Sequence, residues 1–167
     1  MIRRKQNQIT RNRDGTAWVI LTQGKRTRVD QVDLPLVRSY AWCASERMPG
    51  YWYAKARNHT DTPRYVYLHQ LLGGSDHRNR DTLDNRRQNL RPATAGENMR
   101  NRRKSQSSRS RFKGVVWNAH QQRWRGEIRR AGDRFVGPYT ASEEVAAAWY
   151  QAMSAKLHGE FGCLDVS

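Results

Sequence analysis

The sequence predicts an α+β fold, with a β-rich N-terminal region followed by a small module of three antiparallel strands and one helix. Between residues 16 and 72, short aromatic and β-branched runs alternate with turn residues, which is typical of strands. A basic run at residues 100–113 contains four serines and no acidic residue, and it separates the two patterned regions. Beyond it, three alternating runs precede one segment with helical spacing.

The N-terminal region is expected to contain five strands, at residues 17–22, 26–29, 41–45, 51–56 and 65–69. Turns are expected at residues 23–24, 48–50 and 61–63. A short helix is predicted over residues 34–39, with Asp33 as its N-cap and Pro35 at its start. We interpret the aromatic side chains of this region as core, and nucleotide stacking is the alternative.

The C-terminal module is expected to contain strands at residues 112–117, 124–129 and 135–139, with turns at 120–122 and 131–133. A helix should follow, beginning at a capping box over residues 140–143 and running to about residue 157, with Gly159 just past its end. Its predicted apolar face consists of Val145, Ala148, Trp149, Ala152 and Ala155.

The charge of the chain indicates its partner. Lys and Arg number 31 against 15 Asp and Glu, which gives a formal charge of +16 and a pI near 10.8. A positive field of this size favours a polyanion, and we predict DNA or a structured RNA as the partner. A merely soluble basic protein without a polyanion partner is the alternative.

Several classes of protein are disfavoured. Cys43 and Cys163 form no Cys-x-x-Cys pair, so the sequence supports neither a zinc finger nor a disulfide framework. The N-terminus has no signal-peptide pattern, and no apolar run reaches the length of a membrane span. We therefore expect a soluble, cytoplasmic protein with no membrane partner and no small-molecule cofactor, acting as a monomer or as a dimer on DNA.

Residues 75–98 carry the strongest functional signal. Asp76 precedes His77, and two amides, Asn89 and Asn98, follow in strongly basic surroundings. Hydrolysis of a phosphodiester needs a hard cation on oxygen ligands and a group that takes a proton from water near neutral pH. Asp76-His77 should end a strand, residues 89–91 should begin the next, and a capping box at residues 94–97 should start a helix that holds Asn98.

This pattern resembles a known family. Asp76-His77, then Leu83-Asp84-Asn85-Arg86-Arg87, Asn89-Leu90-Arg91, Thr94 and Asn98, is similar to the HNH nucleases, in particular the phage homing endonucleases with Asn as third motif residue. The resemblance implies a ββα-metal module within residues 65–104 and a bacteriophage source. It also implies that Asp76 and Asn98 bind one Mg²⁺ or Mn²⁺. His77 would act as general base, and Asn89 would fix the loop and orient the His77 ring.

The C-terminal module resembles a second family. Lys113-Gly114-Val115, then Arg123-Trp124-Arg125-Gly126-Glu127-Ile128-Arg129, Gly137-Pro138-Tyr139 and His158-Gly159-Glu160-Phe161, is similar to the AP-two (ethylene-response-factor) DNA-binding domain. The resemblance implies a sheet that reads the major groove. We expect a nuclease region at residues 1–104, a tether at 105–110 and a DNA-binding domain at 111–167.

The leading hypothesis is a site-specific endonuclease that nicks or cuts double-stranded DNA with its nuclease module and is positioned by the C-terminal domain. A non-catalytic DNA-binding regulator on a degenerate nuclease scaffold is the alternative. DNA contacts are predicted for a set of basic and aromatic side chains, although core packing is the alternative for the two tryptophans. The set comprises Arg86, Arg87, Arg91, Arg100, Arg102, Arg103, Lys104, Lys113, Trp117, Arg123, Trp124, Arg125 and Arg129.

Overall fold

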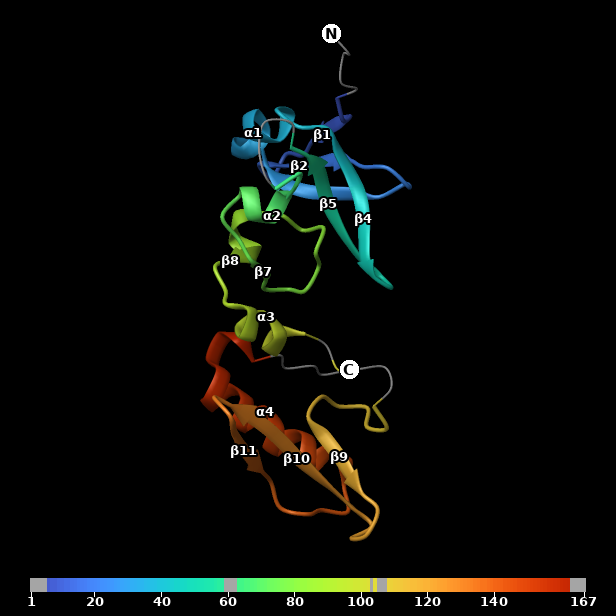
Figure 1. Cartoon of the computed structure of the whole chain (residues 1–167), viewed down its shortest axis with the longest axis vertical. Coiled ribbons are helices and arrows are strands. Elements are labelled where there is room, and N and C mark those ends of the chain that lie inside the picture. The colour runs from blue at the N-terminus through green and yellow to red at the C-terminus, as the bar shows by residue number, and fades with distance from the viewer. Residues whose placement is uncertain (1–5, 59–62, 103, 105–107, 163–167) are drawn as a thin grey trace. The chain divides into compact units, whose positions relative to one another are not determined.

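A computed structural model of the chain describes residues 6–58, 63–102, 104 and 108–162. The chain divides into two compact units, Met1–Thr94 and Ala95–Ser167, which are coloured blue to green and yellow to red in Figure 1. Each unit combines antiparallel strands with helices, so the predicted α+β class is confirmed. No described helix has both the length and the apolar composition needed to cross a membrane.

The first unit begins with a sheet of order β1-β2-β3. Its strands are β1 (Ile9–Arg11), β2 (Thr16–Ile20) and β3 (Arg26–Asp30). The hairpin between β2 and β3 turns at Gln23 and Gly24, which both have positive φ, as a tight turn requires. Ala17, Val19 and Val29 are fully buried. β1 was not predicted, because three residues with only one apolar side chain carry too weak a strand signal.

A second sheet in this unit has the order β4-β5-β6. Its strands are β4 (Trp42–Met48), β5 (Tyr51–Arg57) and β6 (Tyr65–Tyr67), each paired antiparallel with its neighbour. The inner face carries Trp42, Ala44, Ala54 and Ala56, which join the first sheet in one core. Trp42 is buried, in agreement with the interpretation of the aromatic residues as core. Trp18 and Trp52 are only half-buried, so that interpretation holds for them in part.

Two local predictions in this unit were wrong. The strand predicted at residues 65–69 ends at Tyr67, and α2 (Leu68–Leu71) takes its second half, because Leu68 and Leu72 then share one buried face. Helix α1 (Leu34–Arg38) follows the 3-10 turn η1 (Gln31–Asp33) as expected, but the Asp33 side chain does not cap it. The Asp33 carboxylate instead accepts hydrogen bonds from Arg87.

The chain then forms the predicted hairpin around the motif. Strand β7 (Asp76–His77) pairs antiparallel with β8 (Leu90–Arg91), and η2 (Arg87–Asn89) leads into β8. The long loop between the two strands runs from Arg78 to Arg86. The predicted helix also forms, as α3 (Ala95–Asn101), which contains Asn98 and belongs to the second unit.

The second unit holds the predicted three-stranded sheet packed on one helix. Its order is β11-β10-β9, from β9 (Val115–Asn118), β10 (Arg123–Arg130) and β11 (Asp133–Val136), and the helix is α4 (Glu143–His158), followed by η3 (Gly159–Phe161). The ends of the basic run are structured, because Arg100 lies in α3 while Ser110 and Arg111 bind Glu143. Within the predicted tether, residues 105–107 lie outside the described residues.

Helix α4 differs from its prediction in cap and in face. Its N-cap is Ser142, whose hydroxyl accepts a hydrogen bond from the Val145 amide, so the helix begins at Glu143 and the capping box predicted from Thr140 was wrong. The buried side chains are Ala146, Ala147, Tyr150 and Ser154, whereas Val145, Ala148, Ala152 and Ala155 of the predicted face are exposed.

Glycines in and beside the sheet explain this rotation of the helix face. A Cβ at Gly114 would lie 2.0 Å from the Tyr150 ring, and one at Gly126 would lie 2.5 Å from the Trp149 ring. A Cβ at Gly137 would lie 2.7 Å from Trp149. The two rings therefore lie against bare backbone, and this fit, which apolar periodicity does not register, sets the orientation of α4.

Candidate active site

The loop that follows His77 is held against two sheets of the first unit. It forms a parallel bridge with β3, where the Arg28 amide donates to the Leu83 carbonyl and the Asn85 amide donates to the Arg28 carbonyl. On its other side, the Thr82 hydroxyl donates to the Trp52 carbonyl of β5 at 2.5 Å. The loop thus has a defined conformation despite its length, and its residue Asn85 contacts the His77 ring.

A chain of hydrogen bonds fixes the tautomer of His77. The Thr27 hydroxyl donates to the Leu83 carbonyl at 2.7 Å, so its oxygen accepts from the Asn85 amide nitrogen, also at 2.7 Å. This directs Asn85 Oδ1, which only accepts, toward His77 Nε2 at 3.3 Å. Nε2 must therefore carry the proton, and the neutral ring keeps its lone pair on Nδ1.

The His77 ring lies in an aromatic cluster. Its centroid is 5.1 Å from that of His69 and 6.3 Å from that of Tyr53, and Tyr67 contacts both Tyr53 and His69. Burial lowers the pKa of His77 and outweighs the opposing effects of the Asn85 hydrogen bond and the nearby carboxylates. The imidazole is thus neutral at pH 7, which is the form that can accept a proton.

Asp76 forms a buried ion pair with Arg91 across the hairpin. Arg91 Nε donates to Asp76 Oδ2 at 2.8 Å, Nη2 lies 2.6 Å from the same oxygen, and the two side chains are 3% and 4% exposed. Arg91, predicted to contact DNA, thus has its guanidinium inside the unit. Both of these contacts fall on one of the two carboxylate oxygens.

Asn89 holds the loop closed. Its Oδ1 accepts from the Asn79 amide at 2.9 Å, and its Nδ2 donates to the Asp84 carbonyl at 2.7 Å. Asp84 itself pairs with Arg86. These bonds hold the loop as predicted for Asn89, while the acceptor observed for His77 Nε2 is Asn85 Oδ1.

The residues predicted to bind a metal offer suitable donors. The Asp76 carboxylate and the Asn98 amide are hard oxygen ligands of the kind that Mg²⁺ takes, and Mg²⁺ commonly keeps several waters and substrate oxygens. Among the described residues, no three His, Cys, Asp or Glu side chains gather in a group that could hold a metal. Asp76 and Asn98 belong to different units, so their joint role stays a prediction.

The predicted DNA-contacting side chains of the C-terminal sheet separate onto two faces. Strand alternation and register place Trp117 and Trp124 on the face that packs on α4, where they form an edge-to-face pair 4.9 Å apart. The outer face carries Arg123, Arg125 and Arg129. Arg125 is held there by Glu127, which also binds Arg134, and by the Tyr139 hydroxyl.

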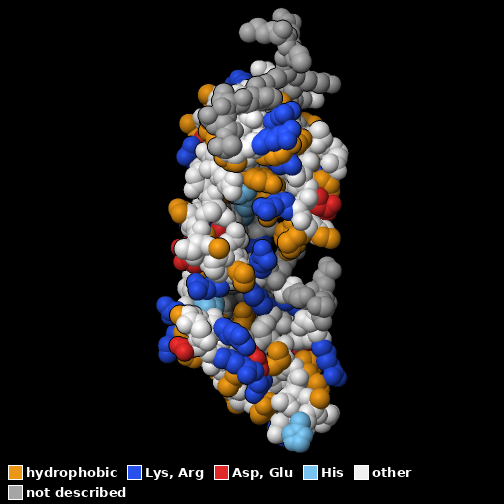
Figure 2. All heavy atoms as spheres, in the orientation of Figure 1, with side chains coloured by type: hydrophobic (Ala, Val, Ile, Leu, Met, Phe, Trp, Pro, Cys, Tyr) orange, Lys and Arg blue, Asp and Glu red, His pale blue; other side chains and the backbone are white. Residues whose placement is uncertain are grey.

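The remaining predicted contacts vary in setting. Arg87 is exposed but paired with Asp33, and Lys113 donates to the carbonyls of Arg100 and Arg102. Arg102 is exposed and Lys104 half-buried, while Arg103 lies outside the described residues. Figure 2 shows Lys and Arg side chains spread over one face of the molecule, with few acidic side chains among them.

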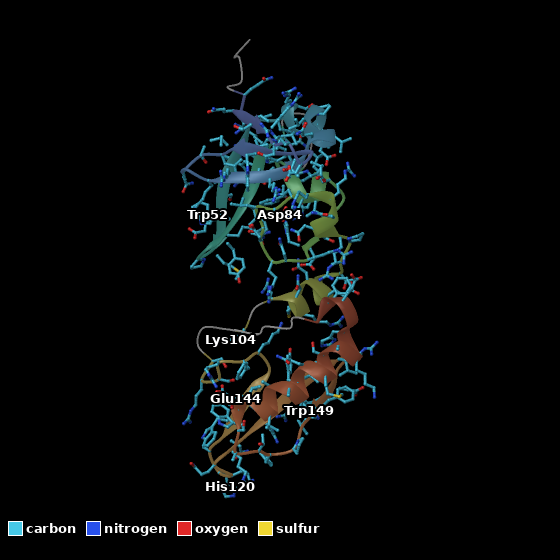
Figure 3. The ribbon with its side chains drawn as sticks, turned by 180° about the vertical axis from the view of Figure 1, so that it is seen from behind. Trp52, Asp84, Lys104, His120, Glu144 and Trp149 are labelled. Atoms are coloured by element: carbon cyan, nitrogen blue, oxygen red, sulfur yellow. The ribbon has the colours of Figure 1, made fainter. Side chains whose placement is uncertain are left out.

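Sequence reasoning missed the partners of His77. Asn85 was noted only as part of the loop in the family motif, although it is 1% exposed. Thr27 was given no role, and Tyr53 was interpreted only as one of the core aromatic residues. The one available signal was Thr27 itself, a polar residue at a core-facing position of β3. Figure 3 labels Asp84, which precedes Asn85 on the loop, and Trp52 on β5.

Comparisons of the chain with protein-family models, with curated proteins and with solved structures find no match.

Proposed function

We propose that the chain is a metal-dependent DNA endonuclease that uses His77 as its general base. The observation that carries the proposal is the oriented, neutral imidazole next to an ionic Asp76 on a hairpin that leads into a helix. A surface binder has no need to bury a histidine and fix its tautomer. In a hydrolase, this arrangement presents Nδ1 as the atom that accepts the proton of water.

In the reaction, a water attacks the phosphorus while His77 Nδ1 takes its proton. The phosphodiester bond to the 3′ oxygen breaks, and this oxygen takes a proton from solvent, which leaves a 3′ hydroxyl and a 5′ phosphate. Asn85 holds the ring through Nε2, and Asn89 keeps the surrounding loop closed. Arg91 fixes the position of the Asp76 carboxylate.

A divalent ion completes the proposal. Asp76 and Asn98 would hold Mg²⁺ or Mn²⁺, and when bound it would stabilise negative charge on the phosphate and on the leaving oxygen. The C-terminal sheet would position the target, with the outward-facing Arg123, Arg125 and Arg129 reaching phosphates or base edges. Trp117 and Trp124 support that sheet from its inner face.

One observation favours a second candidate, a non-catalytic DNA-binding regulator. The Asp76–Arg91 pair is nearly fully buried, and such a pair can hold a hairpin together without any metal. In this case the hairpin would be a scaffold.

Nicking of supercoiled plasmid separates the two candidates. The wild-type chain should nick the plasmid with Mg²⁺ and not with EDTA, and His77→Ala should lower the rate by about 10² to 10⁴ while DNA binding persists. His120→Ala, at an exposed turn, is the matched control. Binding without nicking under all metal conditions would favour the regulator, and displacement of duplex by RNA at lower concentration than by DNA would point to an RNA partner.

A further inference from the structure

The outer face of the β4-β5-β6 sheet interleaves aromatic and basic side chains. Strand alternation places Ala54 and Ala56 on the core side of β5, so Tyr53, Lys55 and Arg57 project from the other side. The register pairs Lys55 with Tyr67 and Arg57 with Tyr65. Together with Arg47 of β4, these residues form what we call the tyrosine–arginine face: Arg47, Tyr53, Lys55, Arg57, Tyr65 and Tyr67.

No acidic side chain of these three strands lies on this face, and the structure describes every residue of the strands. The strands contain a single acid, Glu46, which pairs with Trp52 and therefore has the opposite orientation. The Glu46 carboxylate accepts a hydrogen bond from the Gly50 amide in the β4-β5 turn. The face thus carries three positive charges from Arg47, Lys55 and Arg57 that no acid on the same strands offsets.

This face is continuous with the candidate base. The Tyr67 ring contacts those of Tyr53 and His69, at 6.0 and 5.8 Å. Tyr53 and His69 both contact His77, at 6.3 and 5.1 Å. A strand of nucleic acid lying along the face would therefore pass next to His77.

Two of these tyrosine rings, those of Tyr65 and Tyr67, already carry cations on their faces. Arg47 lies 5.4 Å from the Tyr67 centroid, and Lys55 and Arg64 lie 4.5 and 5.8 Å from that of Tyr65. These contacts position the cations, since a cation over an aromatic face is held by the ring quadrupole. They also occupy the surfaces on which an unpaired base would stack.

We propose that the tyrosine–arginine face binds the phosphate backbone of duplex DNA and so holds the strand that is cut at His77. Contact through ammonium and guanidinium groups suits phosphates, which dominate sequence-independent DNA affinity. Base stacking on this face is disfavoured, because cations cover the rings of Tyr65 and Tyr67. The link to cleavage rests on the proposed function, whereas binding of duplex by the face does not.

Salt-dependent binding tests the proposal on the full chain without any cleavage. We compare Arg47→Gln/Lys55→Gln/Arg57→Gln with a control triple variant, Arg11→Gln/Arg13→Gln/Arg38→Gln, which removes the same charge from exposed arginines of the same unit that lie off this sheet. Fluorescence anisotropy with a labelled duplex of mixed sequence gives the dissociation constant at several salt concentrations.

The face variant should lower the slope of log affinity against log salt by about 0.9 for each phosphate that the protein no longer neutralises, and the control should leave the slope unchanged. The charge-preserving variant Arg47→Lys/Arg57→Lys should keep most of the slope. Equal slopes for the two Gln triple variants would overturn the proposal, because any decrease would then reflect net charge. Unchanged circular dichroism and melting temperature verify folding.

A photo-crosslinking residue at Tyr65, which is 44% exposed, provides a positional test. It should crosslink to the duplex, while the same residue at Val32, which is 76% exposed on η1, should not. Crosslinking at Val32 alone would place the duplex elsewhere. Displacement of the duplex by a lower concentration of single-stranded DNA would overturn the assignment to duplex backbone. Absence of plasmid nicking, by contrast, would count against the proposed function and leave these results intact.

Discussion

Arg91 and Asp76 meet across the β7-β8 hairpin, with Arg91 Nε 2.8 Å from Asp76 Oδ2 and both side chains almost fully buried. The pair fixes the residue that precedes the candidate base. It also makes the stability of the hairpin depend on keeping both charges, because one buried charge without the other is strongly unfavourable.

Arg91→Met should therefore lower the free energy of unfolding by about 3 to 5 kcal/mol, as measured by urea denaturation. Arg28→Met is the control, because the Arg28–Asp14 pair is half-exposed and should be worth less than about 1 kcal/mol. Asp76→Leu/Arg91→Met should be more stable than Arg91→Met alone. A double variant that is less stable than the single one would show that the unpaired Asp76 carboxylate is not the cause of the destabilisation.

Asn85→Leu should slow plasmid nicking by up to about 100-fold while duplex affinity is unchanged, because the His77 ring loses the acceptor that orients it. Thr27→Val, which removes only the next link, should have a smaller effect in the same direction. An independent measurement is the ¹⁵N shifts of His77, which should report a proton on Nε2 in the wild type. A wild-type ring protonated on Nδ1 would contradict the assigned tautomer.

Stability should fall as pH decreases from about 6.5 toward 3. Burial, and repulsion from His77 and Arg47, lower the pKa of His69 to about 3. The unfolded chain, with an ordinary histidine near pH 6.5, therefore binds a proton that the folded chain excludes, and protonation favours unfolding throughout that interval. His69→Phe should flatten the curve of melting temperature against pH between these limits. If the melting temperature of His69→Phe depends on pH as steeply as that of the wild type, groups other than His69 cause the loss of stability.

Gly126→Ala should destabilise the C-terminal sheet by about 1 to 3 kcal/mol, the usual effect of overpacking, since its Cβ would lie 2.5 Å from Trp149 and 2.9 Å from the Ala146 carbonyl. Gly96→Ala is the matched control, because the nearest heavy atom, on the flexible Arg100 side chain, is 3.9 Å away and alanine favours helix. Thermal unfolding measures both. Equal stability of Gly126→Ala and wild type would contradict the close packing of Trp149 on β10.

Arg129→Ala should relax base preference at particular positions, by about 1 to 3 kcal/mol for each bidentate hydrogen-bonded pair that is removed, because Arg129 lies on the outer face of β10. Arg102→Ala should instead weaken binding to all sequences alike, as expected of a side chain that binds phosphate. Selection from random duplexes followed by affinity measurements distinguishes the two. Loss of base preference in Arg102→Ala would contradict the assignment of Arg102 to phosphate contact.

The sequence alone was sufficient for those elements whose signals are local. Alternation and turn residues predicted β2 to β5 and the C-terminal sheet, and the resemblance of the motif that contains Asp76, His77 and Asn89 to a nuclease family implied the β7-β8 hairpin. The helix around Asn98 was also predictable, because helix starts are marked by nearby residues. These features depend on neighbours within a few positions of the chain.

Tertiary structure decided what depends on residues far apart in sequence. Thr27 and Asn85 are 58 positions apart, yet their hydrogen bond sets the tautomer of His77. Arg91, expected at the DNA surface, is drawn inside by Asp76, 15 positions earlier. The face of α4 was set by glycines on the sheet, because a ring packs wherever a missing Cβ leaves room, and no periodicity within the helix encodes that space.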